Sequence, residues 1–175
     1  KNVNEDIALV EQVEGTYEGL AKNGYAVVPD VVPGVECSRL VNVLNQLKND
    51  RENASTEGHT ESTKEERRFV EASGQVLLRD CLLDRPEVLL NFVDLPLVTM
   101  TLSRLFGEMA ILDGFSASTT YQRDPRYSHP PKIHIDSRLA MPEINNTTHL
   151  ATMICLEDFT ELNGGIKIWP GSHRS

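Results

Sequence analysis

The first part of the chain carries its apolar side chains at helical spacing. Over residues 4–23 they recur every three or four positions and an Asn-Gly pair follows, so the pattern predicts an amphipathic helix ending at residue 23. Residues 25–28, Tyr-Ala-Val-Val, predict a short buried strand, and residues 35–48 predict a second helix. Residues 49–68 hold almost no apolar side chain, and we expect them to form a mobile surface loop.

The period of the pattern changes in the second half of the chain. A short apolar segment at residues 76–78 precedes two further predicted helices, residues 86–92 and 97–106, the second of which is closed by Gly107. Beyond residue 108 the apolar stretches are short, β-branched or alternating, and Gly, Pro, Asp and Asn separate them, which is typical of an all-β sandwich or barrel. The predicted strands are residues 110–112, 115–122, 132–137, 147–156 and 165–169.

These patterns predict a single domain over residues 1–175, with a helical part at residues 1–108 and a β part at residues 109–175. The chain has 175 residues, 39% of them hydrophobic, which is enough to bury a core. We therefore expect an α+β fold that is mainly β, with helices at its N-terminal side.

Composition narrows the class of function. The formal net charge is −9 and the basic residues are scattered, which argues against nucleic-acid binding. No apolar run approaches the roughly 18 residues of a membrane span. The three cysteines lie far apart without CxxC spacing, as free thiols in a reducing compartment do. We therefore expect a cytoplasmic protein that contacts neither nucleic acid nor membrane, in an oligomeric state that the sequence leaves open.

The sharpest chemical signal is the triplet His134-Ile135-Asp136. On a strand, residues two apart point to the same face, so the imidazole and the carboxylate converge while the isoleucine packs behind them. A neutral nitrogen donor and an anionic oxygen donor make two corners of the two-His-one-carboxylate face of non-haem Fe(II) oxygenases. Taken alone, the triplet is equally the signature of a strand histidine paired with a nearby aspartate.

Three sequence blocks in this order resemble the phytanoyl-CoA dioxygenase family of Fe(II)/2-oxoglutarate oxygenases. They are NGYAVVPD at residues 23–30, the HID triplet at 134–136, and the run from NGG to PGSH at 163–173. The resemblance implies a double-stranded β-helix, a jelly-roll barrel with the metal at one mouth. It also implies Fe(II) and 2-oxoglutarate as cofactors, and hydroxylation of a small organic or acyl substrate by O2 with release of succinate and CO2.

The resemblance assigns roles to residues that match the family pattern. His134 and Asp136 fall on the iron ligands, and Gln122 lies on the strand before them, where relatives place a polar side chain near 2-oxoglutarate. Lys132 is a rival for that task, and Thr148 or Thr152 could face the same pocket from the next strand. A shift of one residue in strand register would move each of these side chains to the opposite face of its strand.

Other residues near the triplet offer further roles. Arg138 follows the triplet closely and could meet an anionic substrate, while His149 faces either the pocket or the solvent. We expect Trp169 in the core, and a tight turn with positive φ at Asn163-Gly164-Gly165.

The chain departs from the family pattern in one respect. In the family, the third iron ligand is a histidine well after the PGSH turn, and an arginine beyond it pairs with 2-oxoglutarate; we expect both beyond Ser175. His173 is the one histidine close to that end. In relatives the histidine of PGSH helps form a turn, and a second interpretation makes His173 the third ligand here. Two alternatives therefore stay open, a cupin-like divalent-metal protein without oxygenase activity and a non-catalytic barrel fragment.

Overall fold

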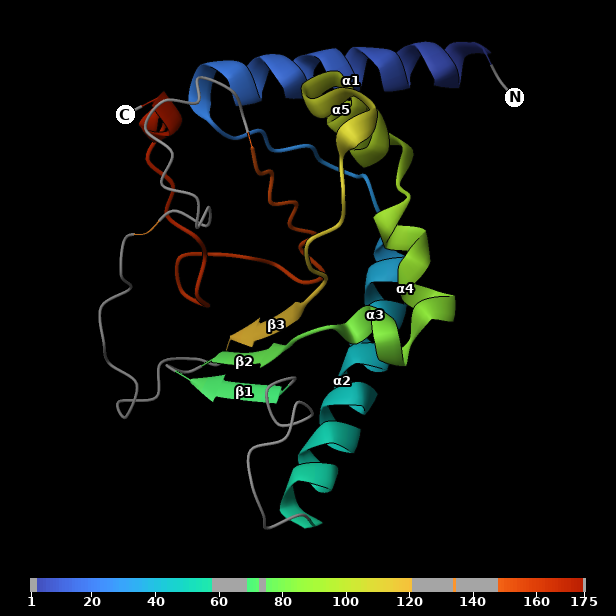
Figure 1. Cartoon of the computed structure of the whole chain (residues 1–175), viewed down its shortest axis with the longest axis vertical. Coiled ribbons are helices and arrows are strands. Elements are labelled where there is room, and N and C mark those ends of the chain that lie inside the picture. The colour runs from blue at the N-terminus through green and yellow to red at the C-terminus, as the bar shows by residue number, and fades with distance from the viewer. Residues whose placement is uncertain (1–2, 58–68, 73–74, 121–133, 135–147, 175) are drawn as a thin grey trace.

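The computed structural model describes residues 3–57, 69–72, 75–120, 134 and 148–174 (Figure 1). Helices occupy the top and one side of the molecule, and a small sheet lies beside them. Residues 148–174, here called segment 148–174, run as irregular backbone between the sheet and α1. The elements in chain order are α1 (Val3–Asn23), α2 (Gly34–Glu57), β1 (Phe69–Ala72), β2 (Gln75–Leu78), α3 (Cys81–Asp84), α4 (Pro86–Val93), α5 (Pro96–Phe106), η2 (Gly107–Met109), β3 (Ala117–Thr120) and η4 (Ser172–Arg174).

The helix boundaries lie at residues that favour them. After α1, Gly24 adopts a left-handed φ of 82° and its N–H donates to the Leu20 carbonyl at 2.9 Å. Pro86 and Pro96 occupy the first positions of α4 and α5. An N–H at this position has no acceptor within the helix, so its absence in proline costs no helical hydrogen bond. Gly107, at a φ of 65°, closes α5. The four longer helices that the sequence predicts are therefore confirmed.

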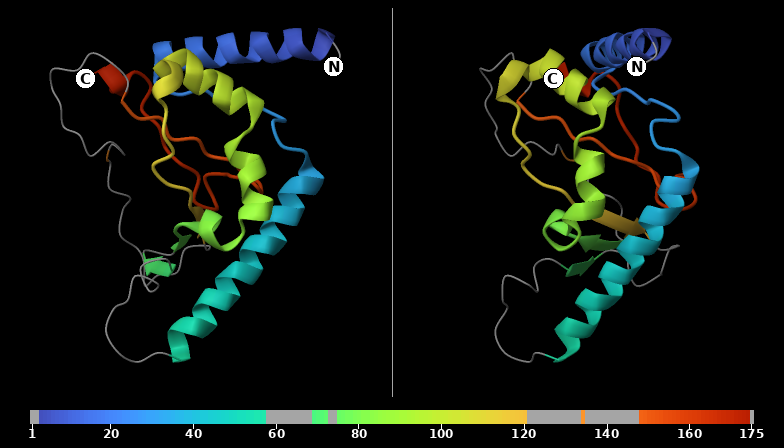
Figure 2. Two further views of the ribbon diagram at one scale, coloured as in Figure 1. Left: turned by 45° about the vertical axis from the view of Figure 1, so that its right-hand side comes forward. Right: turned by 90° about the vertical axis from the view of Figure 1, so that its right-hand side faces the viewer.

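The helix α1 packs across α5 at the top of the molecule, as both views in Figure 2 show. Its Val13 is buried, and its Tyr17 ring lies under the Arg104 guanidinium of α5, 4.2 Å from carbon to ring centroid. Glu14 adds an ion pair to Arg104 at 3.5 Å, with both side chains about half exposed. Such an exposed pair is worth little, so the buried apolar contact dominates this junction.

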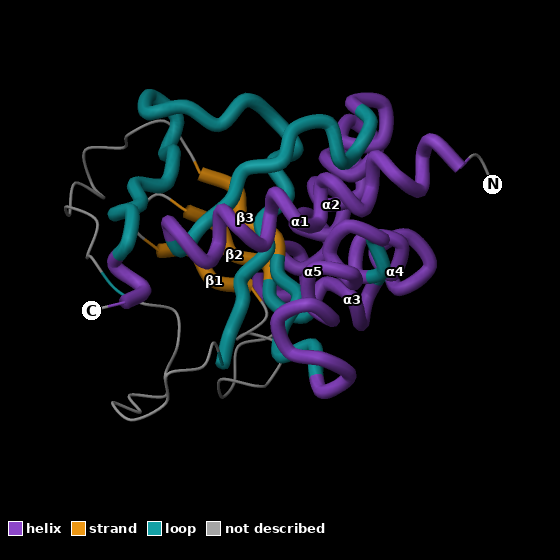
Figure 3. The backbone as a smooth tube through the Cα atoms, turned by 90° about the horizontal axis from the view of Figure 1, so that it is seen from above, coloured by secondary structure: helices purple, strands orange, loops and turns teal. Residues whose placement is uncertain are grey.

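The sheet is antiparallel, with β2 between β1 and β3 (Figure 3). Gln75 of β2 pairs with Ala72 of β1 and with Thr120 of β3. The side chains of Val76 and Leu78 alternate with their neighbours and are buried. One face of β2 therefore contributes to the core, together with the partly buried Ala117 of β3.

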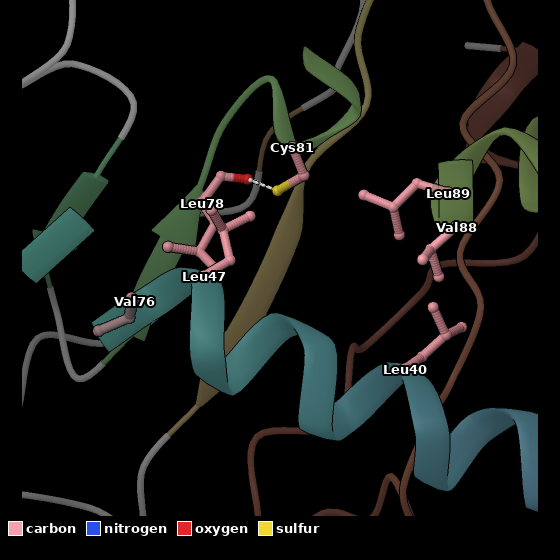
Figure 4. Close-up of a cluster of buried hydrophobic side chains, with 7 residues drawn as sticks. All are labelled: Leu40, Leu47, Val76, Leu78, Cys81, Val88 and Leu89. Carbon is pink, nitrogen blue, oxygen red and sulfur yellow. Dashed lines mark hydrogen bonds between the residues drawn. The ribbon is translucent and has the colours of Figure 1, made fainter. Parts of the chain in front are cut away.

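The core lies where α2 crosses β2 and the short helices α3 and α4 (Figure 4). Cys81 is fully buried, and its Sγ donates to the Leu78 carbonyl at 3.0 Å. Burial raises the pKa of this thiol, although a backbone hydrogen bond from Ala117 and the nearby Arg51 act in the opposite direction. The buried cluster consists of Leu40, Leu47, Val76, Leu78, Cys81, Val88 and Leu89.

Two reciprocal ion pairs join α2 to the junction of α3 and α4. Arg51 pairs with Asp84 and also donates to the Arg79 carbonyl at 2.7 Å. Asp50, the neighbour of Arg51 on α2, accepts from Arg85 at 2.8 Å. The Arg51 pair is the more buried of the two, with side chains 11% and 23% exposed, so it is screened less by solvent. These pairs hold the polar C-terminal part of α2 beside the core.

The expectation of a mainly β jelly-roll barrel is wrong. The described residues are mostly helical, and their strands form a single three-stranded sheet. Of the strands predicted beyond residue 108, the described residues include Ala117–Thr120, which lies inside the predicted range 115–122. The predicted strand at residues 132–137 lies outside the described residues, apart from residue 134. Residues 110–112, 148–156 and 165–169 are neither helix nor strand. A strand needs a neighbour to satisfy its N–H and C=O groups, and within the described part of the chain these three stretches have none.

Three more local expectations need correction. The predicted strand at residues 25–28 is irregular backbone, and Val27 within it is 82% exposed. Residues 49–57 of the predicted loop belong to α2, where Asp50 and Arg51 form the ion pairs to the junction of α3 and α4. Trp169 is 52% exposed, so it is not a core residue. The rest of the predicted loop, residues 58–68, lies outside the described residues.

Within the described residues, no single helix has the length and apolar character to cross a membrane, while one bent pair, α4 followed by residues 96–109, passes that test jointly with a bend of 52°.

We expect Leu89→Ala to lower the free energy of unfolding by about 2–5 kcal/mol, because Leu89 is 2% exposed and truncation leaves a cavity. Leu162→Ala is the matched control, because Leu162 is 88% exposed and its truncation leaves no cavity. Urea unfolding followed by circular dichroism measures both. Equal midpoints for the two variants would show that the cluster around Leu89 is not the core.

We expect a thiol reagent to label Cys155 readily in the folded protein and Cys81 after unfolding, because Cys155 is exposed and burial raises the Cys81 pKa. The same shift makes stability depend on pH. Above the usual value of 9.0 the unfolded chain releases the Cys81 proton first, so the free energy of unfolding falls as pH rises further. Because Cys37 is partly exposed, the double variant Cys37→Ser, Cys155→Ser isolates the slow reaction of Cys81. Labelling of Cys81 at the Cys155 rate would contradict this prediction.

Candidate functional site

Of the two predicted metal ligands, the structure describes His134. This residue is exposed and lies in neither helix nor strand. Asp136 lies outside the described residues, as do Gln122, Lys132 and Arg138. The convergence of the His134 and Asp136 side chains therefore stays a prediction from the sequence.

The chemistry of this donor pair fits Fe(II). An imidazole nitrogen and a carboxylate oxygen are both ligand types that the ion accepts in oxygenase sites. Among the described residues, no group of three His, Cys, Asp or Glu side chains is placed to hold a metal ion. The fit therefore rests on the two donors of the triplet.

Two further predicted residues open segment 148–174. Thr148 and His149 are both exposed. Further along, Leu150, Ile154 and Leu156 are partly buried, and Leu156 packs against the core cluster. Thr148 and Thr152 share the even parity of these partly buried residues but are exposed, so parity along this irregular backbone places neither Thr148 nor His149 on an inner face.

The Asn-Gly-Gly turn is built as the sequence predicts. The Asn163 Oδ1 accepts from the Thr160 N–H at 2.7 Å and from the Thr160 hydroxyl at 3.2 Å, and its Nδ2 donates to the Asp158 carbonyl. Gly164 has a φ of 100°, a conformation that favours glycine. A Cβ at Gly165 would lie 2.7 Å from the Thr160 carbonyl oxygen. The side-chain amide therefore closes the turn, and the two glycines make it possible.

This turn is attached to the end of β3. The Thr120 hydroxyl donates to the Asn163 carbonyl at 2.7 Å, across 43 positions of sequence. A Cβ at Gly164 would lie 3.0 Å from the same hydroxyl oxygen, so the turn approaches the strand closely. Thr120 directly precedes residues 121–133, which lead to the triplet. The turn is therefore anchored where the chain enters the predicted metal segment, and sequence reasoning missed both Thr120 and Thr160 because hydroxyl partners carry no spacing signal.

The other predicted ligand, His173, lies against α1. Its Nε2 is 3.3 Å from the Ala21 carbonyl oxygen. The groove between α1 and α5, about 450 Å³ and lined by Val13 and Met100 among others, contains none of the predicted site residues.

A family model described as phytanoyl-CoA dioxygenase (PhyH) matches residues 20–175, far more than half of the chain. No curated protein and no solved structure gives a significant match. The match includes all three sequence blocks that carry the resemblance.

We expect Thr120→Val to lower the free energy of unfolding by about 1 kcal/mol, because it removes the hydroxyl that donates to Asn163 and keeps the side-chain shape. Thr119→Val on the same strand is the matched control, since Thr119 is exposed and its hydroxyl does not reach the turn. Chemical denaturation measures both. Equal losses in the two variants would contradict an anchoring role for Thr120.

Proposed function

Because the chain belongs to the phytanoyl-CoA dioxygenase family, we propose that it hydroxylates a small organic or acyl substrate with O2 and 2-oxoglutarate, releasing succinate and CO2. Family membership implies an oxygenase of the Fe(II)/2-oxoglutarate type. The observation that carries the proposal is the His134-x-Asp136 triplet inside a family match that spans residues 20–175.

In this proposal His134 and Asp136 hold the metal. Bound Fe(II) supplies the redox chemistry with O2 that no protein side chain provides. The imidazole contributes a neutral nitrogen and the carboxylate a negative oxygen, so together they neutralise part of the ion's charge and leave positions open. The exposed position of His134 is compatible with access by small molecules from solvent.

Binding of 2-oxoglutarate requires cationic or hydrogen-bonding groups, since the molecule carries two carboxylates. Lys132 offers an ammonium, while Gln122 and Thr148 offer neutral donors. Thr148 is exposed, so its hydroxyl is accessible to a molecule from solvent. Arg138 and His149 are assigned to the substrate, where an arginine suits an anionic group.

The chain as a whole is acidic, with a formal net charge of −9. An anionic cosubstrate is therefore repelled over long distances and attracted only locally, by the few cationic side chains near the triplet. This makes Lys132 and Arg138 the residues whose charge the proposal needs most. A location in the reducing cytoplasm agrees with three cysteines that are all free.

We expect His134→Ala and Asp136→Ala each to abolish Fe(II) binding while the midpoint of urea unfolding stays nearly unchanged. Each variant removes one of the two donors of the triplet, and His134 is exposed, so its truncation leaves no cavity. His59→Ala is the matched histidine control, because it lies in the polar stretch outside the triplet. Anaerobic calorimetry with Fe(II) measures the affinity, and succinate formation measures turnover.

Two results would separate the proposal from its alternatives. Unchanged Fe(II) affinity in either variant would overturn the metal assignment. Tight metal binding without any dependence on 2-oxoglutarate would instead favour a cupin-like metal protein.

A further inference from the structure

Two motifs that the proposed reaction does not use meet at the C-terminal end of α1. The Gly171 N–H donates to the Asn23 carbonyl at 2.8 Å, and the Arg174 guanidinium donates to the Ala21 carbonyl. The His173 Nε2 lies 3.3 Å from the same Ala21 oxygen. In Figure 1 the red turn that ends segment 148–174 lies beside this end of α1. The PGSH turn is therefore seated on the helix that precedes the NGY block.

The chemistry of the contact suits a helix end. The last carbonyls of a helix have no N–H partner within it, and they carry the negative end of the helix dipole. Ala21 and Asn23 belong to this last turn of α1. Donors from Gly171, His173 and Arg174 satisfy them, and the guanidinium adds a favourable charge. The turn thus acts as a cap supplied from about 150 positions away.

The Nε2 atom of the His173 ring makes this contact, while Nδ1 faces Gly24. A carbonyl oxygen only accepts, so the proton that joins His173 to Ala21 is on Nε2. The other nitrogen, Nδ1, faces Gly24 so closely that a Cβ built there would lie 2.5 Å from it. Gly24 also has a φ of 82°, so both the close approach of His173 and the backbone conformation favour glycine at this position. Neither ring nitrogen is directed at a separate metal site.

We infer that His173 is a positioning residue, which holds segment 148–174 against α1. The segment has three attachments: the partly buried Leu156 against the core, the Asn163 turn on Thr120, and the PGSH turn on α1. Thr148, a proposed 2-oxoglutarate residue, is carried by the same segment. This inference rests on the proposed function. We expect loss of the His173 contact to weaken 2-oxoglutarate binding and to leave Fe(II) affinity unchanged.

The experiment compares His173→Ala with His173→Gln in the full chain. Alanine removes the donor, and glutamine restores an N–H donor at similar reach. We expect alanine to weaken 2-oxoglutarate binding about tenfold, because small misplacements of binding groups are costly, while Fe(II) affinity changes less than about twofold. Glutamine should recover most of the loss. Lys167→Ala is the matched control on the same segment, since Lys167 is exposed and pairs with Glu161 instead of α1.

A second measurement tests the contact without using the reaction. Gly24→Ala should lower the urea midpoint, because its Cβ meets the His173 ring and its φ is strained. Adding His173→Ala to Gly24→Ala should recover part of that loss, since the clash is relieved while the strain remains. Purely additive losses would overturn the contact.

The outcomes separate the two proposals. If His173→Ala and His173→Gln both lose iron as His134→Ala does, then His173 is a ligand and the inference is overturned. If neither variant changes 2-oxoglutarate binding, the positioning role is overturned. If the unaltered chain binds neither iron nor 2-oxoglutarate, the proposed function fails, and the coupling between positions 24 and 173 alone supports or overturns the attachment of the turn to α1.

Discussion

The packing of α2 against β2 and α4 is the contact on which the rest of the structure depends. Leu47 and Leu89 are each 2% exposed and Cys81 is fully buried, so this crossing excludes water completely. The cluster is small for a chain of this length, and each buried leucine contributes about 1.5–3 kcal/mol. Phe115 and Leu156 reach the same cluster from later in the sequence. Elements far apart in the chain are therefore placed by their contact with one short stretch of α2.

Segment 148–174 shows how that dependence extends to the candidate site. Away from its attachments its apolar side chains are largely exposed, as Met153 at 60% and Ile166 at 55% illustrate. The path of the segment is determined by three separate contacts to the rest of the molecule, because its described residues form no strand ladder. Each contact uses a different interaction: apolar packing at Leu156, a hydroxyl bond at Thr120, and carbonyl capping at Ala21. Weakening one contact should therefore displace the segment while the core cluster stays folded.

The helices could be predicted from the sequence because their hydrogen bonds and their apolar faces both arise within a few residues. The strand expected at residues 148–156 did not form. Alternation of side chains there shows only a preference for extended backbone, and a strand also requires a hydrogen-bonded partner. The turn at Asn163 was predictable from its two glycines, whereas its bond to Thr120 spans 43 positions and carries no local signal. The candidate ligands His134 and Asp136 were recognised by residue type and spacing, which says nothing of how exposed they are.

The candidate site residues that the structure describes are exposed to solvent, whereas the proposed reaction requires that water be excluded from them. An oxygenase reaction needs a pocket from which water is excluded, since water quenches reactive species and weakens every electrostatic contact. His134, Thr148 and His149 are all exposed in the described part of the chain. In the proposed reaction, a bound substrate would exclude water from these three side chains. The attachment of segment 148–174 at three points holds Thr148 and His149 to the rest of the molecule, and this is why a contact as distant as His173 with Ala21 bears on the proposed reaction.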